Sequence, residues 1–229
     1  MVKKLIATDF DGTLFINGNI SNEVRKAIEL WRADGRYFGI VTGRGSDFFE
    51  KVKEENIPTD FLVLYNGSLA ADGNYNIFYE KFIPADLFLQ IERVLSEYKD
   101  IEQYSVSDGN PQHQFYATFG NFERALNVKN DLESMFGDRL AVFVNGRHIN
   151  IGIAGSGKTE GVRVVLEHFS LSKDDAAVVG DDFNDIEMIK AFDGWAVESG
   201  KAEVVKAAPH ICKDVGSLAM TLLTKSFAR

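Results

Sequence analysis

The sequence has little cysteine, no surplus of basic residues and no long apolar run. Cys212 is the only cysteine of the 229 residues, so no internal disulfide can form, which is typical of a reducing compartment. The net charge of -9 disfavours nucleic acid and anionic membranes as partners, since both bind basic surfaces. No apolar run approaches transmembrane length, and Asp9 interrupts the one N-terminal run that imitates a signal peptide. We therefore expect a cytoplasmic protein without nucleic-acid or membrane partners.

Short apolar strands alternate with amphipathic helices at both ends of the chain. Strands are expected at residues 4–8, 37–41, 61–65 and 176–180, and helices between Ser21 and Gly35, around 48–52, after Lys158 and around 186–189. A parallel sheet covered on both faces produces this alternation. The fold class predicted from it is α/β, a Rossmann-like doubly wound parallel sheet.

The middle of the chain follows a different pattern, a helix and two strands, repeated once. Turns at 108–111 and 145–146 separate the strands of each pair. This order predicts a small antiparallel sheet with helices on one face. We expect a discontinuous core at residues 1–82 and 152–229 and an inserted α+β cap at residues 83–151, a length compatible with a small domain.

Two carboxylates, Asp9 and Asp11, stand at the end of the first strand and precede the turn at Gly12. Like charges this close raise each other's pKa unless a cation or hydrogen-bond donors compensate them. Mg²⁺ prefers carboxylate and carbonyl oxygens and keeps part of its shell open for water and phosphate. The end of this strand therefore predicts a metal-assisted reaction centre.

Two further strand ends carry polar, glycine-flanked groups, and Lys158 opens a helix after the insertion. The segments are Thr42-Gly43-Arg44 and Gly180-Asp181-Asp182-Phe183-Asn184-Asp185. Taken singly, they could be an ordinary turn, an acidic helix start and a surface lysine. Ligands of doubly wound sheets bind at the carboxyl ends of the strands, and together these groups supply what phosphoryl transfer needs.

In this order the segments resemble the four motifs of the haloacid dehalogenase superfamily. The spacing, Asn66-Gly67 after the third strand, and the tail segments 194–197 and 202–208 resemble its Cof-type branch, whose cap lies between the second and third motifs. The resemblance covers roughly residues 1–80 and 150–229, while the insertion matches only in size and element order.

The resemblance implies a role for each catalytic residue. Asp9 would be the nucleophile and form an aspartyl-phosphate, and Asp11 would protonate the leaving alcohol and then deprotonate water. Thr42 would bond a phosphoryl oxygen, and Lys158 would offset the charge of phosphate and nucleophile. Mg²⁺ would be held by the Asp9 carboxylate, the Asp11 carbonyl, Asp181 and Asp185, the last of these through water.

Five residues are expected at the substrate. Backbone amides around Gly12 and Gly43 could cradle phosphate oxygens, and Asn184 would orient its loop or touch the phosphate. Asn66 is expected beside them. Arg44 would meet substrate or else pair with an acid of the core. Asp182 is interpreted as a helix cap or a solvated charge.

The implied activity is that of a Mg²⁺-dependent phosphomonoesterase acting on a small phosphorylated metabolite such as a sugar phosphate, as a monomer or small homo-oligomer. Because the global charge repels anions, the phosphate site must be locally cationic. Two alternatives remain, a phosphomutase of the same superfamily and a noncatalytic phosphometabolite-binding protein. In the cap, Arg147, His148, His113 and Gln114 could reach the substrate or could be solvent-facing sheet residues.

Residues 152–159 also satisfy the P-loop pattern letter for letter, and residues 176–181 resemble a Walker B strand. That interpretation predicts a nucleotide hydrolase. It leaves Asp9, Asp11 and Thr42 without a role, and only about 70 residues follow the lysine, fewer than such a domain normally has. We therefore favour a link from cap to core that delivers Lys158.

Overall fold

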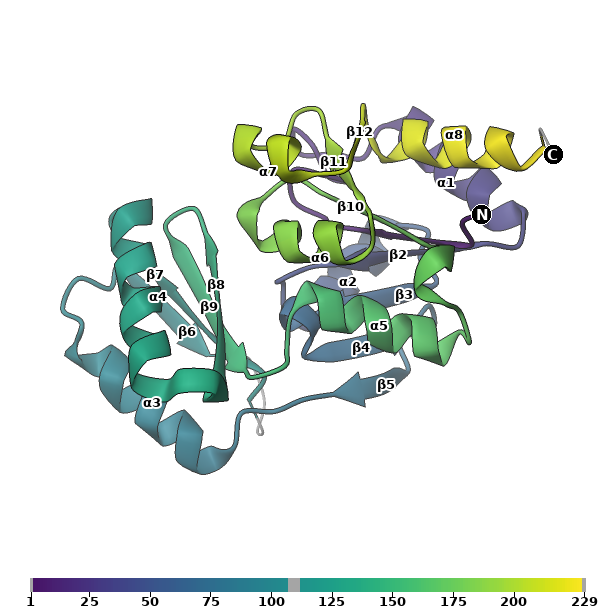
Figure 1. Ribbon diagram of the computed structural model, residues 1–229. Helices are drawn as coiled ribbons and strands as arrows, with labels where there is room; N and C mark the ends of the chain where they lie inside the picture. The colour runs from purple at the N-terminus through teal and green to yellow at the C-terminus, as the bar shows by residue number, and fades with distance from the viewer. Residues whose placement is uncertain (1, 107–111, 228–229) are drawn as a thin grey trace.

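The computed structural model describes residues 2–106 and 112–227, which form two lobes (Figure 1). The larger lobe, the core, contains the elements from both ends of the chain, and the smaller lobe, the cap, is built from the middle of it. The turn expected at residues 108–111 lies outside the described residues.

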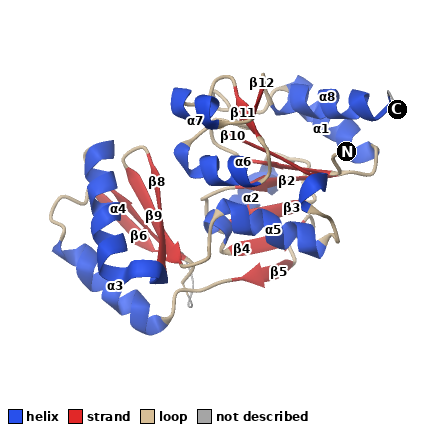
Figure 2. Cartoon of the chain, in the orientation of Figure 1, coloured by secondary structure: helices blue, strands red, loops and turns tan. Residues whose placement is uncertain are grey.

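The core is built on an eight-stranded sheet (Figure 2). Six neighbouring strands are parallel and two at one edge are antiparallel, in the order β12 (His210–Cys212), β11 (Trp195–Val197), β10 (Ala176–Gly180), β1 (Leu5–Thr8), β2 (Tyr37–Val41), β3 (Phe61–Leu64), β4 (Leu69–Asp72) and β5 (Ile77–Glu80). The predicted doubly wound parallel sheet is confirmed. The two antiparallel strands, β4 and β5, are joined by a hairpin at Asp72-Gly73, where the sequence indicates a hairpin turn.

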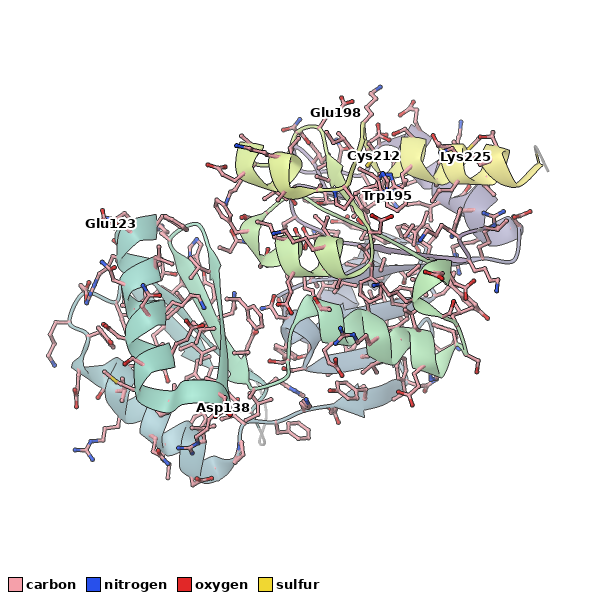
Figure 3. All side chains as sticks on the ribbon, viewed as in Figure 1. Glu123, Asp138, Trp195, Glu198, Cys212 and Lys225 are labelled. Atoms are coloured by element: carbon pink, nitrogen blue, oxygen red, sulfur yellow. The ribbon has the colours of Figure 1, made fainter. Side chains whose placement is uncertain are left out.

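Helices cover both faces of this sheet because its strands are apolar on both sides. Ile6 of β1 faces a hydrophobic cluster with α1 (Asn22–Ala33), α2 (Phe48–Glu54) and α8 (Val215–Phe227). Its neighbours Leu5 and Ala7 face a second cluster with α5 (Lys158–His168) and α6 (Ile186–Ala191). The short α7 (Ala202–Ala207) packs beside α6. Cys212 is buried in the core (Figure 3).

The cap contains a four-stranded antiparallel sheet and two helices that pack on one of its faces. The strand order is β6 (Gln103–Val106), β7 (Gln114–Thr118), β9 (His148–Ile153) and β8 (Leu140–Asn145), and the helices are α3 (Ala85–Glu97) and α4 (Phe122–Phe136). The predicted α+β insertion is confirmed as an architecture. Its boundaries at residues 83 and 151 stay predictions, and β9 continues two residues beyond the second of them.

The ends of α1 show how sequence places these elements. The Ser21 hydroxyl accepts a hydrogen bond from the Val24 N–H at 3.3 Å, and Gly35 takes a positive φ of 76° just after the helix. Between them Trp31 is fully buried against the sheet. In the described part of the chain, none of the helices combines the length and hydrophobicity needed to cross a bilayer.

Candidate active site

Three neighbouring strands of the core sheet end at the same edge. Asp9 follows β1, Thr42 follows β2 and Asp181 follows β10, and β1 lies between the other two. A cavity of about 830 Å³ opens there between core and cap. Asp9, Asp11, Thr42 and Asn184 all line it, so segments far apart in sequence meet at the predicted place.

Lys158 lies almost fully buried at the start of α5 and joins two of these segments. Its Nζ donates to Asp9 Oδ1 at 2.5 Å and to Asp185 Oδ1 at 2.6 Å. Burial opposes its charged form, but the adjacent Asp185 and Asp9 outweigh burial and raise the pKa of Lys158. The site therefore contains a permanent internal cation.

One ammonium does not neutralise the carboxylates around it. Oxygens of Asp9, Asp181 and Asp185 lie within 4.8 Å of one another. Burial, helped by the neighbouring acids, raises the pKa of Asp9, and burial raises the pKa of Asp181 to about 6. This surplus of buried negative charge and its all-oxygen donor set fit a hard divalent cation.

Asp185 holds this part of the site together. Besides accepting from Lys158, it accepts hydrogen bonds through Oδ2 from the N–H groups of Asp181 and Asp182 at 3.0 and 3.1 Å. Both of its oxygens thus have protein partners, which agrees with a ligand that acts through water. Asp182 caps the short turn Phe183–Asp185 and pairs with Lys201 at 2.6 Å, as its interpretation as a cap requires.

Asp11 and Arg44 form a two-pronged ion pair at the mouth of the cavity. Arg44 Nε and Nη2 donate to the two oxygens of Asp11, both at 2.7 Å, and the guanidinium lies over the Phe10 ring. Of the two expectations for Arg44, the structure has the pairing with an acid. The Asp11 side chain is outside the three-carboxylate cluster, so its predicted contact with metal rests on the backbone carbonyl and stays a prediction.

The two glycines expected at the phosphate differ. The Gly12 N–H donates to the Phe15 carbonyl at 3.1 Å, and the prediction that amides around Gly12 cradle phosphate stays a prediction. Gly12 is required for another reason: its φ is +89°, and a Cβ there would lie 2.4 Å from Asp181 Oδ2. The Gly43 N–H has no partner among the described residues, and Gly43 lines the cavity.

Asn66 packs behind the loop formed by Thr42-Gly43-Arg44 and does not line the cavity. It is fully buried, its N–H donates to the Thr42 carbonyl at 3.0 Å, and its Nδ2 lies 3.5 Å from Gln114 Oε1. The side chain is fully buried behind Gly43, and its direct contact with substrate stays a prediction. Asn184 does line the cavity, and its Oδ1 is buried without a partner within the described residues.

The four cap residues that were candidates for substrate contact lie in different surroundings. His113 and Gln114 are buried, so the solvent-facing alternative is wrong for both: His113 stacks on Tyr65, and Gln114 Nε2 donates to the Gly43 carbonyl at 3.0 Å. Arg147 is bonded to Glu102 at the edge of the cap sheet. His148 lines the cavity.

Some residues of the site were missed by sequence reasoning. The Thr13 hydroxyl donates to Asp181 Oδ1 at 2.6 Å and lowers the pKa that burial raises. The polar wall that the cap contributes was also missed, although its alternation with apolar residues along the cap strands was a readable signal. Its members not yet named as site residues are Gln103, Ser105, Tyr116, Asn145 and Asn150.

The P-loop interpretation fails on topology. The strand before the glycine-rich segment is β9, which pairs antiparallel with β7 and β8 in the cap. A P-loop instead joins a strand of the core parallel sheet to its helix and cradles phosphate with its backbone. Here the segment crosses from cap to core and sets Lys158 against Asp9.

Comparisons with known proteins agree with this geometry. The sequence profile of the haloacid dehalogenase-like hydrolases matches residues 6–111 and 92–217. The chain is 27% identical to the 5-amino-6-(5-phospho-D-ribitylamino)uracil phosphatase YcsE of Bacillus subtilis over 92% of this chain and 90% of that protein. It is 26% identical to a phosphoglycolate phosphatase of Sulfolobus acidocaldarius, over 95% and 89% of the two chains.

A HAD/COF-like hydrolase from Plasmodium vivax has a similar fold, with a TM-score of 0.81 and 21% identity over 99% of this chain and 96% of that one. The fold, the convergence of the four segments and the match of the family profile over most of the sequence all point the same way. The chain belongs to the haloacid dehalogenase-like hydrolases.

Proposed function

We propose that this protein is a Mg²⁺-dependent phosphomonoesterase that hydrolyses a small phosphorylated metabolite, such as a sugar phosphate, through an aspartyl-phosphate on Asp9. The chain is a hydrolase of phosphoric monoesters by family, and its relatives include phosphatases of a ribityl phosphate and of phosphoglycolate. The metal, the substrate class and the covalent intermediate are the proposed parts. The observation that carries them is the contact of Lys158 with Asp9 inside a cluster of three carboxylates.

Asp9 is the proposed nucleophile. Lys158 binds only its Oδ1, which fixes the carboxylate and leaves Oδ2 without a hydrogen-bond partner among the described residues. A bond from Asp9 oxygen to phosphorus forms as the ester P–O bond breaks, and water then attacks phosphorus and releases Asp9. Thr42, buried at the cavity, has a hydroxyl suited to a phosphoryl oxygen.

Asp11 is the proposed proton carrier. In the first step it gives a proton to the leaving oxygen, and in the second it takes one from the attacking water. Arg44 Nε and Nη2 donate to its two oxygens and hold the carboxylate in place. For the first step we infer that the substrate phosphate competes for Arg44 and opens this ion pair, since both lie at the mouth of the same cavity.

Asp9 and Asp181, with Asp185 behind them, would hold the metal. When bound, a divalent cation supplies positive charge that stabilises the phosphoryl oxygens and keeps the clustered carboxylates ionised. We also keep the cytoplasm as the compartment, and a monomer or small homo-oligomer as the assembly, as parts of this proposal.

The test is phosphate release from a panel of phosphorylated metabolites, with Mg²⁺ and again after chelation. In Mg²⁺ we expect free phosphate to be released from phosphate esters of uncharged sugars or polyols. Chelation should stop this release, and adding Mg²⁺ back should restore it. Conversion of a hexose phosphate to its isomer without free phosphate would instead identify a phosphomutase. No turnover of any ester in the panel would contradict both.

A further inference from the structure

The cap sheet presents two chemically different faces. Residues 115, 117, 142, 144, 149 and 151 are apolar and buried against α3 and α4. The alternate residues point the other way, toward the core, because side chains alternate along a strand. In Figure 1 the cap strands β8 and β9 lie on the side that faces the core, with α4 on the outer side.

The core-facing side forms two polar rows in register across the strands. Ser105, Tyr116 and Asn150 are successive partners in one row, and Gln103, Thr118, His148 and Asn145 are partners in the other. All of these except Thr118 line the cavity. The rows therefore form the wall opposite Asp9, where the leaving group of a substrate must lie.

Among the residues that the structure describes, the cap wall carries no formal charge. The charged residues of this described lining belong to the core, and four of the five are acids: Asp9, Asp11, Asp47, Asp182 and the cation Arg44. Arg44 pairs with Asp11 and, in the proposed reaction, is taken by the phosphate that is cleaved. A carboxylate or second phosphate on the leaving group would thus approach acids without meeting a cation of the cap.

Hydrogen bonds and ring stacking hold the orientation of His148 in this wall. The hydroxyls of Tyr116 and Thr118 lie 2.7 and 2.9 Å from its Nδ1, and the Tyr116 ring stacks on it. Burial and the adjacent Arg147 lower the pKa of His148, so the ring is neutral near pH 7. Either hydroxyl can direct its proton at the lone pair of Nδ1, and in that tautomer, which is part of the proposal below, the single ring proton is on Nε2.

Building on the proposed function, we propose that His148 is a specificity-determining residue: its Nε2–H donates a hydrogen bond to a hydroxyl of the leaving group, and the uncharged cap wall selects against leaving groups with a second negative charge. Nε2 has no partner among the described residues, so the donor is available to a ligand. Thr118 is a positioning residue, since it holds the ring but does not line the cavity.

The test compares two substrates of equal chain length, ribitol 5-phosphate and n-pentyl phosphate, which lacks the hydroxyls. His148→Asn keeps a group near Nδ1 but removes the donor at Nε2, whereas His148→Gln keeps a donor near Nε2. We expect His148→Asn to lower kcat/KM for ribitol 5-phosphate about tenfold, chiefly through KM, as expected for one neutral hydrogen bond. His148→Gln should retain most of the wild-type kcat/KM for ribitol 5-phosphate. The wild-type protein and both variants should hydrolyse n-pentyl phosphate equally.

Thr118→Val tests the positioning step without changing the cavity lining. It should lower kcat/KM for ribitol 5-phosphate about threefold and leave n-pentyl phosphate unchanged. Independently of activity, long-range ¹⁵N–¹H spectra of His148 should show the proton on Nε2. A proton on Nδ1, or equal losses of activity with both substrates, would overturn the proposal.

The charge selection is tested with phosphoglycolate and ribitol 5-phosphate in the wild-type protein. We expect kcat/KM for phosphoglycolate to be at least about tenfold lower. Equal or better hydrolysis of phosphoglycolate would contradict the role of the cap wall while leaving the proposed phosphatase intact. Absence of turnover of all three esters would overturn the proposed function and this inference with it.

Discussion

The ammonium of Lys158 lies 2.5 Å from a carboxylate oxygen of Asp9, although 149 positions separate the two residues in sequence. The whole cap is inserted between them. The contact forms because β9 returns the chain from the cap to the start of α5, beside the end of β1. Asp9 and the Lys158 ammonium thus come together only when both ends of the chain have folded into one core.

Replacing Asp9 by asparagine should remove hydrolysis and retain binding. The amide is a poor nucleophile, whereas Lys158, Thr42 and Arg44 would still position the phosphate. We expect kcat to fall by about 10⁴-fold or more, with the Kd for substrate changed only a few fold. Phosphate release and calorimetric binding measure the two effects. Asp138→Asn, on an exposed turn of the cap (Figure 3), is the control and should behave as wild type.

Replacing Lys158 by methionine should destabilise the metal-free protein. Its removal leaves the carboxylates of Asp9 and Asp185 buried without their partner, which costs about 3 kcal/mol. Urea unfolding in the presence of a chelator measures the change. Lys51→Met provides the control, because Lys51 pairs with Glu55 at the same distance of 2.5 Å but partly in solvent. That pair should contribute less than about 1 kcal/mol, and equal losses for the two variants would argue against a buried charge cluster.

Binding of Mg²⁺ should weaken as the pH falls. The pKa of Asp181 is raised to about 6, so below that pH a proton occupies the carboxylate that the metal needs. The affinity should fall by about tenfold per pH unit below pH 6 and stay nearly constant between about pH 7 and 8. Titration calorimetry at several pH values checks this.

The Thr13 hydroxyl supplies a matched variant for the same measurement. Thr13→Val removes the hydrogen bond that lowers the pKa of Asp181, so the pH at which Mg²⁺ affinity begins to fall should move upward. An affinity independent of pH in both proteins would show that Asp181 is not a ligand.

Substituting Gly67 should disturb the site from a distance. Its φ is +91°, and a Cβ at this position would lie 2.1 Å from the Gly157 carbonyl oxygen, directly before Lys158. Gly67→Ala should therefore lower the free energy of unfolding through left-handed backbone strain and by about 1–3 kcal/mol more through the forced contact. It should also lower kcat. Gly35→Ala is matched to it, since Gly35 also has a positive φ but open space around it. The unfolding free energies of the two variants should differ, and similar values would contradict the close contact.

Local sequence was sufficient for the core strands that carry the site and for their ends. The alternation of strands and helices placed β2 at Tyr37–Val41 and β10 at Ala176–Gly180, and the rule for doubly wound sheets brought Asp9, Thr42 and Asp181 to one edge. The contacts that were missed are ones that a pattern of residue types does not specify. Gln114 reaches the Gly43 carbonyl across 71 positions of sequence, and within one loop the Gly12 N–H turns to the nearby Phe15 carbonyl.

The core-facing wall of the cap could be predicted from sequence only in part. Its alternation is local and was readable in β7 and β9, where polar residues such as Tyr116 and His148 alternate with buried Phe115 and Ile149. Which face would meet the catalytic cavity depends on how the cap packs on the core. That orientation follows from tertiary contacts such as the one between Gln114 and Gly43.

The account depends on attack at phosphorus by Asp9, and borohydride trapping tests this step most directly. Borohydride reduces an acyl phosphate to an alcohol, so quenching the working enzyme with it should convert Asp9 to homoserine, detected by peptide mass spectrometry. We predict this conversion only when both substrate and Mg²⁺ are present, and at Asp9 alone. Reduction of a different carboxylate, or unmodified Asp9 in samples that trap an acyl phosphate elsewhere on the chain, would contradict the account.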